Sequence, residues 1–299
     1  MTSPATLGQT VASAGAYYAL DRAYRAALAQ TSLLVAQALG ILWRDVDPAN
    51  LAGSAPAFLP DAVEAVVGGQ RRATSATDAY ARLVRQLSVP DAPLWTPPPV
   101  KPPNREQIRS SIEFLAFKET GQKIGAVEQS VAEEPDVEAA QRTLTGRRKQ
   151  LVDEAIARIV GGATRLTTGA AEQRMEDVVR SDRVAIGWAR TTKPGCCYFC
   201  AMLASRGAVY EEDSFESSNP LFTNGAIPSD QKVHDSCGCG LRPMYRREDP
   251  MPERQDVYEA IWIDSGAKAS GPAAVRAFRR AYEAHPVSRP AEESDTTEQ

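Results

Sequence analysis

The side chains best suited to chemistry are five cysteines and one histidine, which are gathered in two short segments about thirty residues apart. The first segment reads CCYFC and the second reads HDSCGC. Together they hold Cys196, Cys197, Cys200, His234, Cys237 and Cys239. The chain has no other cysteine and one other histidine, His285, which has no acidic or cysteine neighbour and is read as a bystander. Thiolate and imidazole are preferred ligands of Zn²⁺, so the clustering indicates a metal-ligand set.

Five of these side chains are candidates for the four tetrahedral positions of a zinc site. They are Cys197, Cys200, His234, Cys237 and Cys239. The favoured set takes both sulfurs of the CxxC pair and two of the three later donors, and which donor is left out stays open. Cys196 is the weakest candidate, because its side chain is expected to point away from that of Cys197.

Other uses of the same residues are open but less favoured. A redox CxxC pair is expected in a βαβ context, which the sequence does not show. Structural disulfides require an oxidising medium. Zinc deaminases carry H-x-E, whereas His234 is followed by Asp235 and Ser236. A cysteine nucleophile with His234 as its base is a further alternative. A structural metal explains the clustering best.

Composition places the chain among ordinary globular proteins. It has 299 residues, enough for two domains, with 43% apolar and 24% charged residues. The net charge of −4 argues against a dominant nucleic-acid groove. There is no continuous apolar run of membrane-spanning length, so we expect no membrane span. The N-terminus lacks the pattern of a signal peptide, and we therefore expect folding in a reducing cytoplasm.

Apolar residues recur every three or four positions through most of the chain, which predicts a mainly α fold. The second predicted helix is loosened at Gly68-Gly69, the third fades near residues 121–125, and the fourth ends at Gly161-Gly162. The predicted helices cover about 16–45, 61–87, 104–121, 135–162, 168–188, 252–263 and 272–282.

The segment Val89–Asn104 contains seven prolines and predicts a stiff extended linker. Trp95 within it is expected to dock on a neighbouring surface. A proline-rich ligand for a partner's aromatic groove is the alternative. Asn104 and Gln107 have the spacing of a capping box and start the next helix.

Around the cysteines the sequence predicts a small α+β, zinc-knuckle-like module near the C-terminus. We expect a short helix at Cys197–Ser205, a strand at Ala208–Tyr210 and a returning strand at Gly240–Tyr245 beside it. So small a module has little core, and a metal would supply stability. The predicted organisation is an N-terminal helical region (1–88), linker (89–104), central helical region (105–190), metal-binding module (191–248), C-terminal helices (249–284) and a disordered acidic tail (285–299).

Three motifs in order resemble the Mu F-like minor head proteins of tailed bacteriophages, closest to those of actinobacteriophages. They are Gly187–Arg190 (GWAR), Cys197–Tyr210 (CxxCxMLASRGAVY) and His234–Pro243 (HDxCxC followed by a proline). The resemblance covers about residues 180–245. The cysteine and histidine pattern of that family falls on the five candidate zinc ligands, and Cys196 is an addition in this chain.

The resemblance implies a non-enzymatic structural role in head morphogenesis, as a minor capsid protein at the portal vertex and capsid interior of a virion assembled in the host cytoplasm. Its implied partners are the portal protein, the major capsid or scaffolding protein and packaged phage DNA. Some family members are fused to toxin or protease domains. A phage enzyme (capsid maturation protease or zinc-dependent hydrolase) and a toxin-like effector ejected with the genome are therefore alternatives, although no HExxH or GxSxG motif is present.

Overall fold

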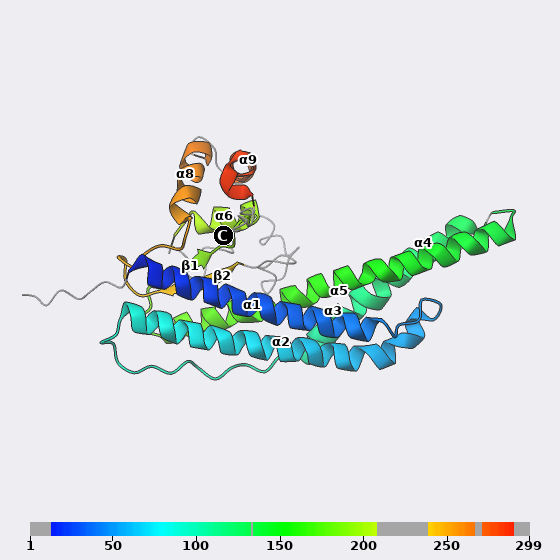
Figure 1. The fold of residues 1–299 in the computed structure, drawn as a ribbon, viewed down its shortest axis with the longest axis horizontal. Coiled ribbons are helices and arrows are strands. Elements are labelled where there is room, and N and C mark those ends of the chain that lie inside the picture. The colour runs from blue at the N-terminus through cyan, green and yellow to red at the C-terminus, as the bar shows by residue number, and fades with distance from the viewer. Residues whose placement is uncertain (1–12, 133, 208–238, 267–270, 290–299) are drawn as a thin grey trace, which may run out of the picture.

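A computed structural model describes residues 13–132, 134–207, 239–266 and 271–289. These residues form a mainly helical fold built on a bundle of long helices (Figure 1), which confirms the predicted class. The helices are α1 (Ala14–Trp43), α2 (Leu51–Ser88), α3 (Arg105–Glu113), the π-helical turn η1 (Phe114–Lys118), α4 (Glu119–Val131), α5 (Val137–Ser181), α6 (Tyr198–Ala204), α8 (Gln255–Gly266), α9 (Gly271–Ala284) and the 3₁₀ turn η2 (Pro286–Ser288). The strands are β1 (Gly187–Thr191) and β2 (Gly240–Met244).

The bundle core is formed by α1, α2 and α5, which pack along one another. Buried residues of α1 recur alternately every three and four positions through most of the helix, the spacing that keeps one helical face against its partners. They are Tyr17, Asp21, Tyr24, Leu28, Thr31, Val35, Leu39 and Trp43. At one end, the Trp43 ring packs edge-on against Phe58 of α2 and close to Phe117 of η1. At the other end, Tyr24 stacks on Tyr80 of α2.

Two glycine pairs that predicted helix breaks lie inside continuous helices, so this part of the prediction is wrong. Helix α2 runs through Gly68-Gly69, and α5 is one helix of 45 residues through Gly161-Gly162. A Cβ on Gly69 would lie 2.5 Å from Cγ2 of Val35 on α1. A Cβ on Gly162 would lie 2.4 Å from Cδ1 of Leu115. These two glycines allow helices to approach closely, and tertiary packing outweighs their weak helix propensity.

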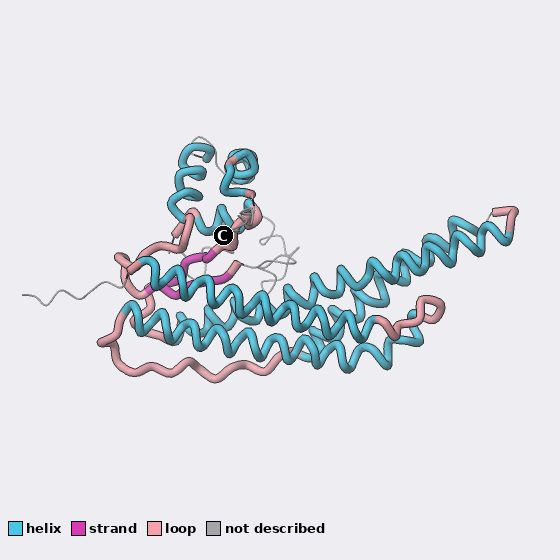
Figure 2. The backbone as a smooth tube through the Cα atoms, in the orientation of Figure 1, coloured by secondary structure: helices cyan, strands magenta, loops and turns pink. Residues whose placement is uncertain are grey.

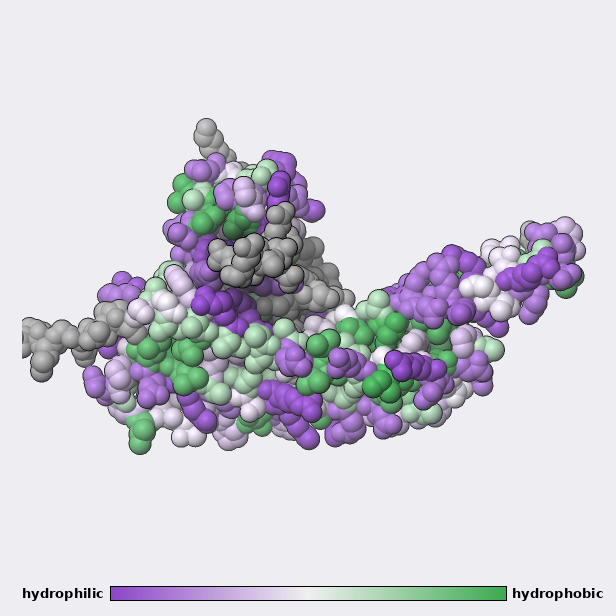
Figure 3. Space-filling view, viewed as in Figure 1, coloured by the Kyte–Doolittle hydropathy of each residue, from purple (hydrophilic) through white to green (hydrophobic). Residues whose placement is uncertain are grey.

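Helix α4 also extends beyond its predicted end, because the chain passes from α3 through η1 and continues as a helix to Val131. Helix α4 and the first part of α5 form a hairpin that projects from the bundle (Figure 1). The visible surface of this hairpin is mostly hydrophilic, whereas hydrophobic residues gather over the face of the bundle seen in Figure 3. Three large apolar side chains of α1, Leu33, Leu34 and Ile41, are exposed.

Helix α1 is, among the described residues, the one helix long and apolar enough to span a membrane by length and composition alone. Its most apolar window has a mean hydropathy of 1.5, because alanine, leucine and uncharged polar residues follow Arg25 up to Trp43. A helix in the core of a soluble bundle can pass the same test, and α1 packs along α2 and α5. The absence of a membrane span therefore stays a prediction.

The proline-rich arm, residues 89–104, runs extended along the bundle between α2 and α3 (Figure 2). The guanidinium of Arg85 donates a hydrogen bond of 2.8 Å to the carbonyl of Pro93 and lies 5.8 Å from the centre of the Trp95 ring. Further along, Arg174 of α5 donates to the carbonyl of Pro98. Trp95 packs, half-buried, against the core, which confirms the expected docking of the arm. Proline supplies carbonyl acceptors without adding donors, so arginines can hold the arm at these points.

The small sheet differs from the prediction in its partners. Strand β2 pairs antiparallel with β1, so that Gly187 lies opposite Met244 and Thr191 lies opposite Gly240. The expected helix through Trp188 ends instead at Ser181, and Trp188 belongs to β1. The strand predicted at 208–210 lies outside the described residues. Helices α6, α8 and α9 and the sheet share one hydrophobic core with α1, α2 and α5.

Replacing Gly69 by alanine is expected to destabilise the protein by about 1–3 kcal/mol, because the new methyl group must displace Val35 at the α1–α2 contact. The measurement is the free energy of unfolding in urea. Gly68→Ala is the matched control, since its Cβ would meet only Arg72, at 3.9 Å. There the better helix propensity of alanine should stabilise by up to about 1 kcal/mol. Equal effects of the two changes would contradict the close approach at Gly69.

Candidate metal centre

The CxxC pair forms a compact turn at the start of α6. Cys197 is the N-cap residue with extended backbone angles, and its Sγ accepts a hydrogen bond of 3.4 Å from the backbone N–H of Cys200. Gly195, just before the cysteines, has a φ of +61°, in the left-handed region that glycine adopts readily. The turn places the Cys197 sulfur next to the backbone of Cys200, and whether both sulfurs bind one ion stays a prediction.

Cys196, read from the sequence as the weakest candidate, lies within the sulfur cluster. Its thiol is hydrogen-bonded to Cys239, which directly precedes β2. The hydroxyls of Tyr258 and Tyr282 lie 3.7 Å and 3.5 Å from its Sγ. Tyr282 also donates to the Cys196 carbonyl. No local pattern predicts this contact, because the two tyrosines come from α8 and α9, more than sixty residues away.

These contacts change the acidity of the groups involved. The pKa of Cys196 is lowered to about 7, chiefly by the hydrogen bond from Cys239 and also by those from the two tyrosine hydroxyls, against the opposing effect of burial. Burial raises the pKa of Tyr258 and of Tyr282, and the neighbouring Cys196 adds to both effects. Both tyrosines therefore stay protonated at neutral pH and can donate hydrogen bonds to sulfur.

The predicted ligands are only partly described. Cys197, Cys200 and Cys239 lie in the described part of the chain, whereas His234 and Cys237 lie outside it. Within the described ranges, no group of three or more histidine, cysteine or carboxylate side chains is arranged to hold a metal. The donor types nevertheless suit zinc, because thiolate sulfur is one of its preferred ligands. The ligand set stays a prediction.

A buried ion pair connects the cysteine region to the bundle. Arg242 of β2 lies 3.1 Å from the Asp21 carboxylate of α1, and their side chains are 0% and 1% exposed. Asp21 also accepts a hydrogen bond from the hydroxyl of Tyr80, and Arg242 donates to the carbonyl of Pro250. The Arg242 guanidinium lies 5.3 Å from the centre of the Tyr17 ring. These contacts satisfy the Asp21 carboxylate and both Nη groups of Arg242, whereas its buried Nε has no hydrogen-bond partner in the described structure.

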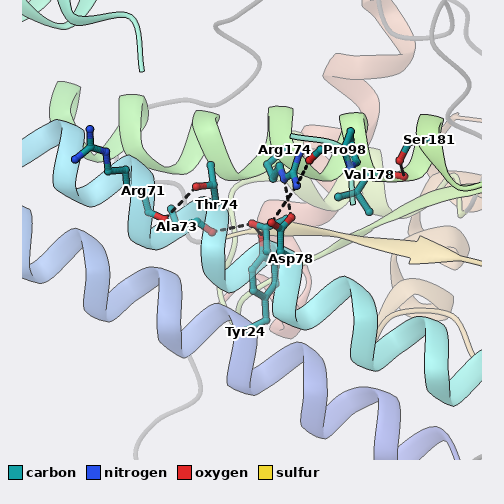
Figure 4. Close-up of polar contacts among 10 residues, drawn as sticks. Tyr24, Arg71, Ala73, Thr74, Asp78, Pro98, Arg174, Val178 and Ser181 are labelled. Carbon is teal, nitrogen blue, oxygen red and sulfur yellow. Dashed lines mark hydrogen bonds and ion pairs between the residues drawn. The ribbon is translucent and has the colours of Figure 1, made fainter. Parts of the chain in front are cut away.

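Three further ion pairs with little exposure follow the same pattern. Arg190 of β1 lies 3.1 Å from Glu172 of α5, so each strand is tied to a different bundle helix. Figure 4 shows Arg174 between the Asp78 carboxylate of α2 and the carbonyl of Pro98. The fourth pair joins Arg85 to Asp182, just after α5. None of the four pairs was predicted, although Arg190 and Arg242 lie within the motifs Gly187–Arg190 and His234–Pro243.

Replacing Arg242 by leucine is expected to lower the free energy of unfolding by about 3–5 kcal/mol, because Asp21 would remain buried without its partner. Arg22→Leu is the matched control. Arg22 pairs with Glu253 at 3.7 Å with both side chains well exposed, so its loss should cost at most about 1 kcal/mol. Urea unfolding of both variants gives the comparison, and similar losses would contradict the importance assigned to the buried pair.

Burial raises the pKa of Asp21 above its ordinary value, although Arg242 opposes the shift. The folded state therefore binds this proton more readily than the unfolded chain does. The stabilisation associated with Asp21 is greatest at low pH and is lost as the pH rises through its folded-state pKa. Relative to Asp21→Asn, which cannot ionise, the wild type should lose stability as the pH rises above about 4. Urea titrations from pH 4 to 8 test this, and the opposite slope would contradict it.

Comparison with known proteins gives a family but no individual relative. Residues 19–264, from α1 to α8, match the VG15 protein family. No curated protein and no solved structure matches the chain. The matched region spans the bundle, the arm, the sheet and the cysteine segments, and it is well over half of the chain. The chain therefore belongs to the VG15 protein family, a family of viral gene products, and this supports the expectation of a phage protein.

Proposed function

We propose that the protein is a structural minor capsid or head morphogenesis protein of a tailed phage, bound to the portal on the inside of the capsid. Its membership of a viral protein family supports a phage context. The more specific role rests on the likeness of its GWAR, CxxC and HDxCxC motifs to Mu F-like minor head proteins. The portal protein and the major capsid or scaffolding protein are the proposed partners, with packaged DNA as a further one.

The burial of the cysteine cluster is the observation that favours a structural site over a catalytic one. Cys196, Cys200 and Cys239 are 3%, 1% and 2% exposed. A catalytic zinc keeps one coordination position open to water and substrate, whereas structural zinc sites are closed by four protein ligands. The buried Cys196 sulfur, in contact with the hydroxyls of Tyr258 and Tyr282, suits a closed site. A protease or zinc-dependent hydrolase is accordingly the second candidate, and a toxin-like effector the third.

The proposed zinc would act as a structural clip. Four of Cys197, Cys200, His234, Cys237 and Cys239 would hold it, and the bound ion would fix the segment before β2 to the turn that starts α6. Because the ligands must be deprotonated and brought together, binding energy at such a site is also folding energy. The ion pairs of β1 and β2 then carry this constraint to the bundle. Cys196, with its tyrosine partners, would support the site from beside it.

Zinc analysis of the purified protein tests the clip. We expect about one zinc per chain, lost together with thermal stability in Cys200→Ser, because this change removes a proposed ligand. Cys196→Ser is the control and should retain zinc, since serine can still hydrogen-bond to both tyrosines. Elemental analysis and thermal unfolding with and without a chelator provide the readouts. A zinc-free wild type, or zinc loss in Cys196→Ser alone, would contradict the proposed ligand set.

Phage particles test the proposed role. Mass spectrometry of purified virions should detect the protein in a few copies, and deletion of its gene should yield defective heads. Complementation with Cys200→Ser should fail to restore assembly. A virion that lacks the protein, or normal heads without the gene, would exclude a structural role. Particles that assemble but fail to mature would instead favour the enzyme.

A further inference from the structure

A groove with a volume of about 260 Å³ lies between the proline-rich arm, the start of α3, and the helices α2 and α5. It is separate from the cysteine cluster and has no part in the proposed function. Arm residues 100–104 form one wall, and residues 165–177 of α5 contribute the other. The volume is sufficient for several water molecules or for a small oxyanion.

The charge of the groove is predominantly positive. Of its described lining residues, four are cationic (Arg71, Lys101, Arg165 and Arg174) and one, Asp177, is acidic. Lys101 pairs with Asp177 at 3.2 Å. The guanidinium of Arg174 is paired with Asp78, which does not line the groove. Each of these two ion pairs is close to neutral, whereas the exposed side chain of Arg71 brings a further positive charge. The groove therefore favours an anion.

Arg174 has a hydrogen-bonding group left over. Its Nε and Nη2 donate to Asp78 at 2.6 Å and 3.0 Å, and Nη2 also donates to the carbonyl of Pro98 (Figure 4). Its Nη1 is buried and has no hydrogen-bond partner in the described structure, although the side chain is only 3% exposed. A buried N–H group without an acceptor is costly, and an anion oxygen placed against Arg174 would satisfy it.

The N-terminus of α3 lies on the same groove. Asn104, its N-cap residue, and Gln107 in its first turn both line the groove, and the Asn104 side chain accepts a hydrogen bond from the Gln107 N–H. The first N–H groups of a helix and its dipole favour negative charge. The helix end and the unsatisfied arginine donor are independent features, and both call for the same ligand chemistry.

We propose that this groove is a binding site for an oxyanion of the phosphate class, held by Arg174, Arg71 and the N-terminus of α3. The guanidinium of Arg71 can offer two parallel N–H groups to two phosphate oxygens. Arg174 would donate a further hydrogen bond to the anion through its Nη1 group. Because Arg174 also holds the arm through Pro98, a bound anion would strengthen the attachment of the arm to α5.

Titration of the full-length protein with inorganic phosphate, followed by calorimetry and compared with chloride at equal ionic strength, tests the site. Saturable binding is expected in the wild type. Arg71→Gln should weaken it about tenfold, the effect of one charge-assisted hydrogen-bonding group. Arg72→Gln is the matched control, because Arg72 is also exposed on α2 but does not line the groove. Arg174→Lys, which keeps the charge but loses the planar fork, should weaken binding by a similar factor.

Two results would overturn the proposal. One is the absence of saturable phosphate binding in the wild type, and the other is an equal loss in Arg71→Gln and Arg72→Gln, which would indicate general surface electrostatics. Circular dichroism checks that each variant is folded. If Arg174→Lys does not fold, the phosphate affinity of Arg71→Gln alone tests the site. Short oligonucleotides with and without a 5′-phosphate separate the sources. Competition by the phosphorylated form alone identifies a terminal phosphate, and equal competition by both identifies a backbone phosphate.

Discussion

The ion pair between Asp21 and Arg242 is the interaction on which the position of the C-terminal half depends. The two residues are 221 positions apart, both are buried, and removing either would leave a charge in the interior without its partner. The pair therefore fixes β2 against α1. The pairing of β1 with β2 then positions β1, which leads into the first cysteine segment, while Cys239 directly precedes β2. The ion pair thus contributes to the placement of the cysteines next to both strands.

The same device recurs at Arg190, Arg85 and Arg174, and at the last two the arginine also binds a carbonyl of the arm. A well-packed apolar pair would often stabilise a fold as much as a buried ion pair does. These pairs make the fold specific for one packing arrangement, because a shifted helix or strand would bury a charge without its counterion. They distinguish one arrangement of three long, alanine-rich helices from many others of similar hydrophobic burial.

Local signals in the sequence were sufficient for the helices, the linker and the CxxC turn, because apolar periodicity, proline content and residue spacing act over a few positions. They were insufficient wherever a residue's role depends on a distant partner. Gly68-Gly69 predicted a loosened helix and Gly161-Gly162 a helix end, because the contacts of Gly69 with Val35 and of Gly162 with Leu115 cannot be read locally. Cys196 was undervalued for the same reason, since the two tyrosines beside it belong to helices α8 and α9. The proposed role in a phage head comes from the resemblance to a phage family, because the spacing of possible metal ligands does not by itself indicate a biological role.

Helix α5 gives the molecule a mechanical property of its own. At about 1.5 Å per residue, its 45 residues extend for roughly 67 Å without a break. One end forms the projecting hairpin with α4, and Glu172 near the other end holds β1 through Arg190 (Figure 1). A force applied to the hairpin is therefore delivered along a single stiff rod to the strand beside the cysteines. The rod therefore couples a contact made at the hairpin to the position of β1 and of the cysteine turn that follows this strand.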